Sequence, residues 1–240
     1  TSLSIVFPLY KDKKTVKIMI DRSIEALKKL KINSEIIIID DGCPQKSGLL
    51  AKKLSKGKKN IKIFFHKKNL GYGAAIRRGI NESSKNWVFA IDGDAEYRVS
   101  DLFKLLRELK NHDLVITYRK KRAHSTMRII ISIVYNFILR ILFRTKFKDI
   151  STGQRLLNKK LTSKIKLKST SPFFGAELVI KSYYLGYKIK EIGVTEYPTR
   201  MIGGSSVSFK NIILTIIEML ELFYKININK FYFFFNELFI

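Results

Sequence analysis

The stretch NWVFAIDGDAEYRVSDL, residues 86–102, contains a short apolar run that ends abruptly in acidic residues. Trp87–Ile91 has the β-branched and aromatic content of a buried strand. Asp92, Asp94 and Glu96 follow it at alternate positions, and alternate residues of an extended backbone point to the same side. Because clustered carboxylates repel one another unless a cation lies among them, the pattern predicts a divalent-cation site. A solvated acidic turn would have the same sequence.

Strand-like runs and helix-like segments alternate on both sides of this stretch. The alternation predicts an α/β fold with a mostly parallel sheet that helices cover on both faces. The expected strands are Ser4–Phe7, Glu35–Ile39, Ile61–Phe65, Trp87–Ile91 and Leu114–Ile116. The expected helices lie near Thr15–Leu30, Ser47–Lys56, Tyr72–Asn81 and Val99–Leu109.

The expected strand ends carry unusual residues, and open parallel sheets bind ligands beyond the carboxyl ends of their strands. We expect Pro8 to end the first strand. Tyr10 and Asp12 follow it and could offer a flat ring and an acceptor to a nucleobase, although an ordinary strand-to-helix turn explains them equally well. Asp41 follows the second strand. Its carboxylate could accept hydrogen bonds from a base or a ribose, or form a turn.

Two glycines follow the third expected strand, in the segment KKNLGYGAAI. Gly71 and Gly73 allow a ligand to approach the backbone closely, and the N-terminus of the following helix suits an anion. The segment is not a dinucleotide fingerprint, because it lacks the third glycine. Each signal is weak alone, but acidic or glycine-rich residues end four neighbouring strands and therefore predict one common site.

The chain is strongly basic, with 46 Lys and Arg against 20 Asp and Glu and a formal net charge of +26. This charge indicates an anionic partner, such as nucleic acid, anionic lipid or a phosphorylated substrate. A compositional bias toward Lys on solvated faces would give the same count. No stretch reaches 18 uncharged apolar residues, so we expect no transmembrane helix.

The order of these motifs resembles the family-two inverting glycosyltransferases of GT-A fold, most closely the branch that contains dolichol-phosphate mannose synthase and polyprenyl-phosphate glucosyltransferases. The resemblance covers nearly all of residues 3–224. SIVFPLYKD looks like the family's Pro-x-Tyr-Asn-Glu turn, with Lys11 and Asp12 in place of Asn and Glu. EIIIIDDGC is similar to its Asp-Asp-Gly-Ser turn, and KNLGYGAAIRRGI to its Asn-x-Gly-x-Gly-Ala-Ala helix start. IDGDAEY looks like its Asp-x-Asp-x-Gln metal motif, with Glu96 in the Gln position.

The second half resembles the lipid-phosphate branch of that family. The matching residues are Arg119, the pair Arg128 and Ser132, and DISTGQR from Asp149 to Arg155. Arginines and a serine hydroxyl are donors suited to phosphate groups, although the residue pattern alone favours an ordinary helix surface for Arg128 and Ser132. YPTRMIGGSSVS resembles the family's Arg-x-x-Gly-x-Ser-Lys segment, with Arg200 as its arginine and Ser206 in place of the lysine.

The resemblance implies a metal-dependent, inverting transfer of a sugar from a nucleotide diphosphate sugar, of the GDP-mannose or UDP-glucose type, to a polyprenyl or dolichyl phosphate. The divalent cation, Mg²⁺ or Mn²⁺, would be bound by Asp92, Asp94 and Glu96. The expected catalytic residues are Asp94, Arg119 and Asp149. The expected nucleotide-binding residues are Pro8, Tyr10, Asp12, Asp41, Gly71 and Asp92. The expected acceptor or phosphate-binding residues are Arg119, Arg128, Ser132 and Arg200.

Two apolar segments bear on domain organisation and location. Residues 128–144 are apolar over most of a helical circumference, and from Asn211 onward polar positions recur at helical spacing. We expect a GT-A domain over residues 1–205, including an apolar helix near 128–144, and C-terminal amphipathic helices over 206–240. These helices would lie in a membrane interface, although packing on the domain would also explain them. The expected location is peripheral, on an anionic membrane surface at the cytoplasmic face, with room for a membrane-spanning partner.

Alternative functions make different demands on the same residues. A glycan or cell-surface polymer acceptor would keep the donor site but would not require Arg119, Arg128 and Ser132. A catalytically silent homologue would bind the nucleotide sugar without transferring it. A nucleic-acid-binding protein is supported only by the net charge, and the acidic strand ends would repel its phosphates, so we expect no nucleic-acid partner.

Overall fold

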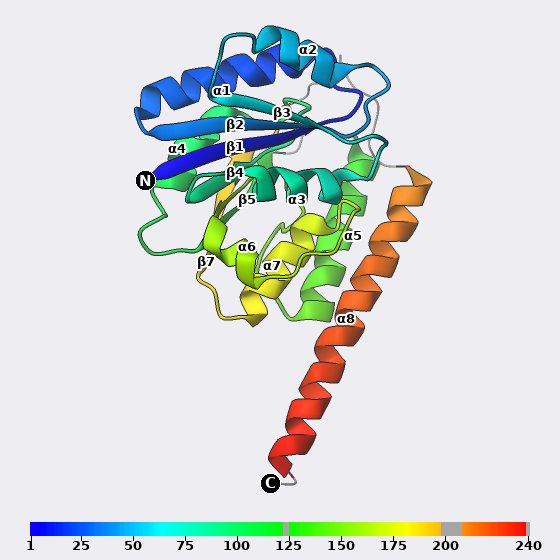
Figure 1. Cartoon of the computed structure of the whole chain (residues 1–240). Helices are drawn as coiled ribbons and strands as arrows, with labels where there is room; N and C mark the ends of the chain where they lie inside the picture. The colour runs from blue at the N-terminus through cyan, green and yellow to red at the C-terminus, as the bar shows by residue number, and fades with distance from the viewer. Residues whose placement is uncertain (122–124, 198–207, 239–240) are drawn as a thin grey trace.

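The computed structural model describes residues 1–121, 125–197 and 208–238, with side chains to residue 228. Seven strands in this part of the chain form one sheet with the order β3-β2-β1-β4-β6-β5-β7 (Figure 1). The strands are β1 (Ser2–Leu9), β2 (Asn33–Asp40), β3 (Ile61–Phe65), β4 (Trp87–Ala90), β5 (Leu114–Lys121), β6 (Arg155–Asn158) and β7 (Ile189–Thr195).

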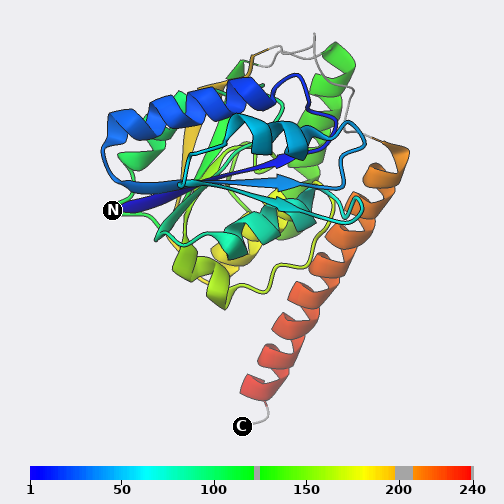
Figure 2. The ribbon, with the colours of Figure 1, turned by 45° about the horizontal axis from the view of Figure 1, so that its top comes forward.

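Helices cover both faces of the sheet, as the alternation predicts (Figures 1 and 2). The helices are α1 (Val16–Leu30), α2 (Ser47–Leu54), α3 (Tyr72–Glu82), α4 (Leu102–Leu106, after the 3-10 turn Val99–Asp101), α5 (Thr126–Phe143), α6 (Lys159–Lys164), α7 (Phe174–Tyr184) and α8 (Phe209–Leu238). One apolar core lies between the sheet and α1, α2 and α4, and a second lies between the sheet and α3, α5, α7 and α8. The predicted α/β class with a mostly parallel sheet is therefore confirmed.

The direction of the strands brings their functional ends to one rim. β1 is parallel to β2 and β4, β2 to β3, and β5 to β7, whereas β6 is antiparallel to both β4 and β5. The chain therefore enters β6 at the same rim where the six parallel strands end. This arrangement brings the segment 149–155 next to the acidic end of β4, because Arg155 pairs with Ala90.

The prediction that Pro8 ends the first strand is wrong. Pro8 lies inside β1 and pairs with Ile39 of β2. On the other side of β1, the paired residues of β4 reach only from Leu3 to Val6. The missing N–H of Pro8 therefore costs no ladder hydrogen bond, as is usual for proline at an unpaired strand edge.

Helix α5 begins and ends within two residues of the expected helix, but most of it is not buried. Its buried residues are Asn136, Leu139 and Phe143. By length and composition α5 could cross a membrane, with a mean hydropathy of 1.7 and 17% of its residues buried. This finding differs from the expectation of no transmembrane helix. The expectation counted only uncharged apolar runs, and α5 contains Arg128 and Arg140.

Over the described C-terminal residues the chain forms a single helix, α8, where several were expected. The segment contains neither glycine nor proline, so nothing in it interrupts a helix. Met219 and Leu222 are buried in the second core, and the Phe223 ring meets the Phe143 ring of α5 edge-on at 6.1 Å. Beyond this contact α8 extends away from the body of the molecule (Figure 1).

Candidate active site

Asp92 lies just beyond β4, in contact with residues from two other segments. Its carboxylate accepts a hydrogen bond of 2.8 Å from the Tyr72 hydroxyl at the start of α3. The Gly153 backbone approaches the same carboxylate so closely that a Cβ there would overlap it. Burial raises the pKa of Asp92, while the Tyr72 hydrogen bond and the positive charges of Arg155 and Arg119 act in the opposite direction.

The neighbouring acids repel each other at this rim. Burial and the charge of Asp92 raise the pKa of Asp94 well above its usual value. Burial also raises the pKa of Glu96 to about 7, against the favourable charge of Arg128. For Asp12, burial raises the pKa to about 6, assisted by Asp92 and opposed by a hydrogen bond from the Tyr10 N–H. The site therefore concentrates negative charge that a bound cation would offset.

The three carboxylates do not form a complete metal-binding set. Among the described residues, no group of three or more His, Cys, Asp or Glu side chains is arranged to hold a metal ion. Glu96 interacts electrostatically with Arg128, Glu196 and Arg119 as well as with Asp92. The hard oxygens of Asp92 and Asp94 still suit Mg²⁺ or Mn²⁺, provided that further oxygens come from a ligand.

Arg119, at the end of β5, lies in a largely buried polar cluster beside these acids. Its guanidinium donates to both oxygens of Asp149, at 2.7 and 3.0 Å, and to Ser132 Oγ on α5 at 2.8 Å. It also lies 3.6 Å from the Glu196 carboxylate. Asn136 on α5 supports the pair, because its amide donates to Asp149 and its carbonyl accepts from the Ile150 N–H. Burial acts to lower the pKa of Arg119, but the hydrogen bonds with Asp149 outweigh it and raise that pKa, so the guanidinium stays charged.

Asp41 and Gly71, two of the expected nucleotide-binding residues, are joined to each other. The Asp41 carboxylate accepts hydrogen bonds from Leu70 N–H at 2.9 Å and Gly71 N–H at 3.0 Å. Asn69 donates to it at 3.0 Å, and a nitrogen of the His66 ring lies 2.6 Å from it. Asp41 therefore shapes the glycine turn that begins α3. Tyr10, in contrast, is 40% exposed at the same rim.

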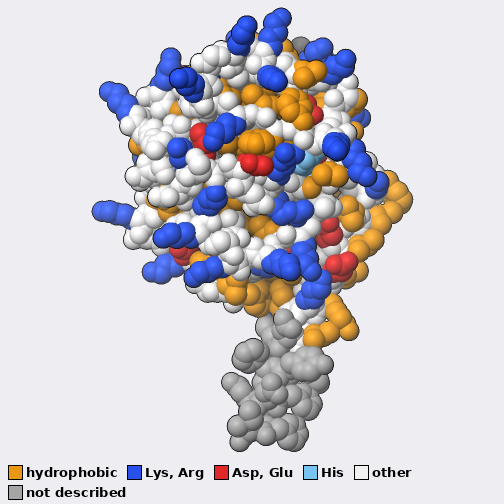
Figure 3. All heavy atoms as spheres, in the orientation of Figure 1, with side chains coloured by type: hydrophobic (Ala, Val, Ile, Leu, Met, Phe, Trp, Pro, Cys, Tyr) orange, Lys and Arg blue, Asp and Glu red, His pale blue; other side chains and the backbone are white. Residues whose placement is uncertain are grey.

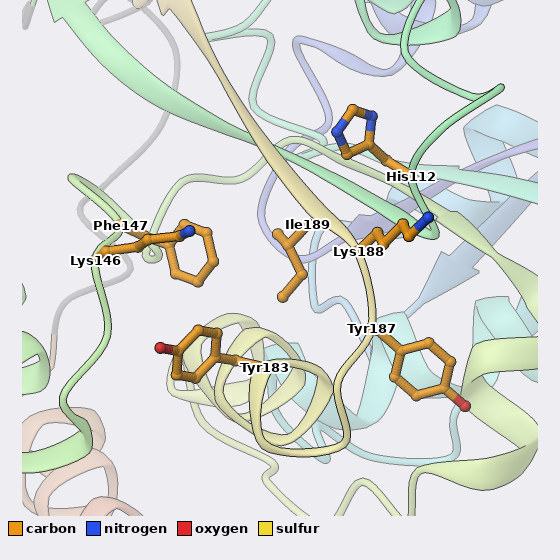
Figure 4. A pocket seen from close by; sticks show the side chains of 7 residues that line it. All are labelled: His112, Lys146, Phe147, Tyr183, Tyr187, Lys188 and Ile189. Carbon is orange, nitrogen blue, oxygen red and sulfur yellow. The ribbon is translucent and has the colours of Figure 1, made fainter.

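Two pockets lie at opposite rims of the sheet. One at the end of β3, beside the Asp41 turn, is lined by Phe65, His66, Lys67, Lys68, Leu70 and Arg78. The other lies at the start of β7, where Phe147, Tyr183 and Ile189 face one another (Figure 4). Neither pocket is lined by an expected site residue, but His66 and Leu70 of the first contact Asp41, whereas the second lies at the other rim and is not part of the candidate active site.

The structure adds residues to the site that the sequence did not single out. Tyr72 lies inside the glycine motif, and Asn136 lies on the helix that carries Ser132. Glu196 follows β7, a strand that the sequence patterns did not indicate. Arg200 lies outside the described residues, so its expected phosphate contact stays a prediction. The remaining expected residues of the site lie at one rim.

A mostly parallel sheet whose strand ends carry paired acids, a glycine turn and an arginine cluster is typical of α/β proteins that bind a ligand beyond the carboxyl ends of their strands. The model of the family "Glycosyl transferase family 2" matches residues 4–166. The chain therefore belongs to this family.

Solved structures confirm the predicted GT-A fold. Mannosyl-3-phosphoglycerate synthase from Rubrobacter xylanophilus superposes with a TM-score of 0.71 over 92% of this chain and 72% of that chain, at 12% identity. Glucosyl-3-phosphoglycerate synthase from Mycobacterium tuberculosis, in complex with Mn²⁺, UDP and glucosyl-3-phosphoglycerate, gives a TM-score of 0.69 over 92% of this chain and 79% of that chain, at 15% identity. At these identities the likeness concerns the fold alone.

Curated relatives include two transferases named for a polyprenyl phosphate. The undecaprenyl-phosphate 4-deoxy-4-formamido-L-arabinose transferase of Pectobacterium atrosepticum is 28% identical over 141 residues, which are 58% of this chain and 43% of that protein. The enzyme of the same name from Yersinia enterocolitica is 29% identical over 139 residues, 57% of this chain and 42% of that protein. The match thus spans less than half the length of these relatives.

Proposed function

We propose that this protein is a cation-dependent, inverting glycosyltransferase that moves a sugar from a nucleotide diphosphate donor to a polyprenyl phosphate at a membrane surface. In this reaction an oxygen of the acceptor phosphate bonds to the anomeric carbon. The bond from that carbon to the donor diphosphate breaks, and the nucleoside diphosphate leaves with the electron pair. An ionised acceptor phosphate needs positioning more than deprotonation.

The acidic rim supports the donor half of this proposal. Asp92 and Asp94 would hold a Mg²⁺ or Mn²⁺ ion whose remaining ligands include the donor diphosphate, and the ion would supply stabilisation of the leaving-group charge. Tyr10 and Asp12 would meet the nucleoside, and the Gly71 turn shaped by Asp41 would let the diphosphate approach the backbone. One structural neighbour was solved in complex with both Mn²⁺ and UDP, which is consistent with this assignment.

The observation that carries the proposal is the position of Arg119 between the acids and α5. Its charge acts on Asp92, while its guanidinium donates to Ser132 on α5 at 2.8 Å. Arg128 lies one turn before Ser132 on the same helix. These donors would hold the acceptor phosphate, and Asp149 would fix the orientation of Arg119.

The outer faces of α5 and α8 support a lipid acceptor over a glycan. Ser132 and Asn136 form hydrogen bonds with Arg119 and Asp149, so the opposite side of α5 is apolar and exposed. The apolar side chains visible along α8 gather on one flank in Figure 3. The exposed apolar residues of α5 include Met127, Ile131, Val134, Phe137 and Ile141, and those of α8 include Phe209, Ile213, Ile216, Ile217, Leu220 and Tyr224. A glycan acceptor would not need this surface, and a catalytically silent homologue would not need the phosphate donors.

We further propose peripheral attachment to an anionic membrane at the cytoplasmic face, with a spanning partner as an optional addition. Although α5 is long enough to span, its polar side makes hydrogen bonds inside the domain, which favours an orientation along the interface. Lys and Arg side chains are scattered over the visible surface rather than gathered in one patch (Figure 3). Their attraction to the membrane, about 1 kcal/mol for each basic residue near an anionic surface, would add to the apolar contact.

The first prediction tests the cation. Asp94→Ala should lower turnover at least about a hundredfold, because the cation that stabilises the leaving diphosphate would be lost. The fold should survive, since Asp94 lies on the rim, and circular dichroism checks this. Asp21→Ala, which removes the same charge from the exposed face of α1, should leave turnover unchanged. Full activity of the unmodified protein in excess chelator would contradict the cation assignment.

The second prediction separates acceptor from donor. Arg128→Ala should raise the KM for the lipid phosphate or lower turnover while leaving nucleotide affinity, measured by calorimetry, nearly intact. Arg22→Ala, an exposed arginine on α1, removes the same charge and should change neither quantity. Equal losses in nucleotide affinity and acceptor kinetics would instead place Arg128 on the donor side.

The third prediction tests the membrane surface by liposome flotation. Binding to anionic liposomes should weaken in high salt, because surface charges are screened within about 8 Å at physiological ionic strength. Apolar insertion should leave a salt-resistant fraction, and Ile131→Gln together with Phe137→Gln should reduce it. Leu49→Gln, an exposed leucine of α2, is the matched control and should not. Complete release of the unmodified protein by high salt would show that these faces are not membrane-inserted.

A further inference from the structure

The loop between α6 and α7 is pressed against the glycine turn that begins α3. The Gly73 N–H donates to the Thr170 carbonyl at 2.9 Å. A Cβ at Gly71 would overlap that same carbonyl oxygen, and one at Gly73 would overlap the Ser169 carbonyl. Gly71 also has a φ of +98°, which disfavours other residues. The glycines are therefore required by contact with the loop as well as by any ligand.

A carboxylate from the C-terminal helix holds this loop from the other side. Glu218 of α8 accepts from Thr170 N–H at 2.9 Å and from Thr170 Oγ1 at 3.2 Å. The hydroxyls of Ser169 and Ser171 donate to its other oxygen. Burial opposes ionisation of Glu218, but these hydrogen bonds hold its pKa below the usual value. The residue is therefore charged at neutral pH, and charge-assisted hydrogen bonds of this kind are strong.

The far side of the glycine turn reaches the acidic rim. Tyr72, between the two glycines, donates its hydroxyl to Asp92 at 2.8 Å. The Gly71 N–H donates to Asp41 at 3.0 Å. A continuous series of contacts thus runs from Glu218 through Thr170 and the glycine turn to Asp92.

We propose that Glu218 is a positioning residue for the donor site. It fixes the loop 169–171 against the glycine turn, and the turn in turn holds the Tyr72 hydroxyl on Asp92. The functional part of this inference rests on the proposed function, because it assigns Asp92 to the donor and its cation. One consequence is that the geometry of the donor site depends on how α8 packs against the domain. The exposed face of this helix is apolar.

The experiment compares Glu218→Gln with Glu221→Gln, a control one turn later on α8 whose carboxylate is exposed and lies 3.5 Å from Lys225. Glu218→Gln should weaken the calorimetric affinity for UDP or GDP in the presence of Mn²⁺ about tenfold, the scale of one lost charge-assisted hydrogen bond. It should raise the KM for the donor and leave the KM for the acceptor unchanged. Glu221→Gln should change none of these quantities.

A double-mutant cycle tests the route through Tyr72. If Glu218 acts through the glycine turn, Glu218→Gln should weaken nucleotide affinity by less than about threefold when Tyr72→Phe is already present. If Glu218 only anchors α8, independently of Tyr72, the two substitutions should have additive effects on nucleotide affinity. Additive effects, or a lower unfolding midpoint with unchanged nucleotide affinity and donor KM, would overturn the inference.

Amide hydrogen exchange of residues 69–76 in the ligand-free protein gives a readout that does not depend on activity. Glu218→Gln should speed this exchange at least about tenfold relative to Glu221→Gln, because the turn loses its support. Unchanged exchange would overturn the inference even if the protein transfers sugar. Failure of the unmodified protein to bind either nucleotide would reject the proposed function, while the exchange result still decides the coupling. If Glu218→Gln does not fold, the same measurements are made on Glu218→Asp, which keeps the charge on a shorter side chain.

Discussion

The burial of carboxylates at the end of β4 is the constraint on which the rest of the site depends. Burial and mutual repulsion raise the pKa values of Asp92 and Asp94, so keeping both ionised costs free energy. The surrounding elements reduce that cost. Tyr72 donates to Asp92 from α3, Gly153 leaves space for its carboxylate, and Arg155 brings a positive charge to it from β6. Part of the charge stays uncompensated, and this excess suits a cation carrying a diphosphate.

The antiparallel insertion of β6 makes these contacts possible. Because β6 lies between β4 and β5, the segment that precedes it crosses the rim and carries Asp149 to Arg119. Arg119 then reaches Ser132, and α5 turns its polar residues to the domain and its apolar residues outward. The same helix therefore contributes to the phosphate-binding cluster and to the exposed apolar surface, as transfer to a membrane-bound phosphate would require.

Local sequence patterns predicted the first half of the fold well. The isoleucine run of β2 and the apolar run before Asp92 are continuous buried strands, which their composition specifies directly. β6 and β7 were not anticipated, because β6 has only four residues, and β7, at the edge of the sheet, has two adjacent charged residues and a glycine within its seven residues. Pro8 was misplaced for a related reason, since its tolerance inside β1 depends on where β4 stops pairing.

The candidate site was predictable as a set of positions but not as a set of contacts. The described residues that match the family motifs lie at one rim, yet the hydrogen bonds of Asp41 to the glycine turn and of Asp149 to Arg119 join segments about 30 residues apart. Glu218 gave no signal, because on its own helix it occupies an ordinary polar position. Its partners lie 47 to 49 residues earlier in the chain, and only the packing of α8 against the domain brings Glu218 next to them.

The most direct test of the proposed transfer is an assay of sugar incorporation into lipid. The protein would be incubated with liposomes containing undecaprenyl phosphate, Mn²⁺ and a panel of UDP and GDP sugars, and the lipid extract analysed by mass spectrometry. One donor should yield a lipid phosphate heavier by a single sugar, with release of an equal amount of nucleoside diphosphate. Donor cleavage without a glycolipid product, or transfer to a glycan in preference to the lipid, would contradict the proposed function.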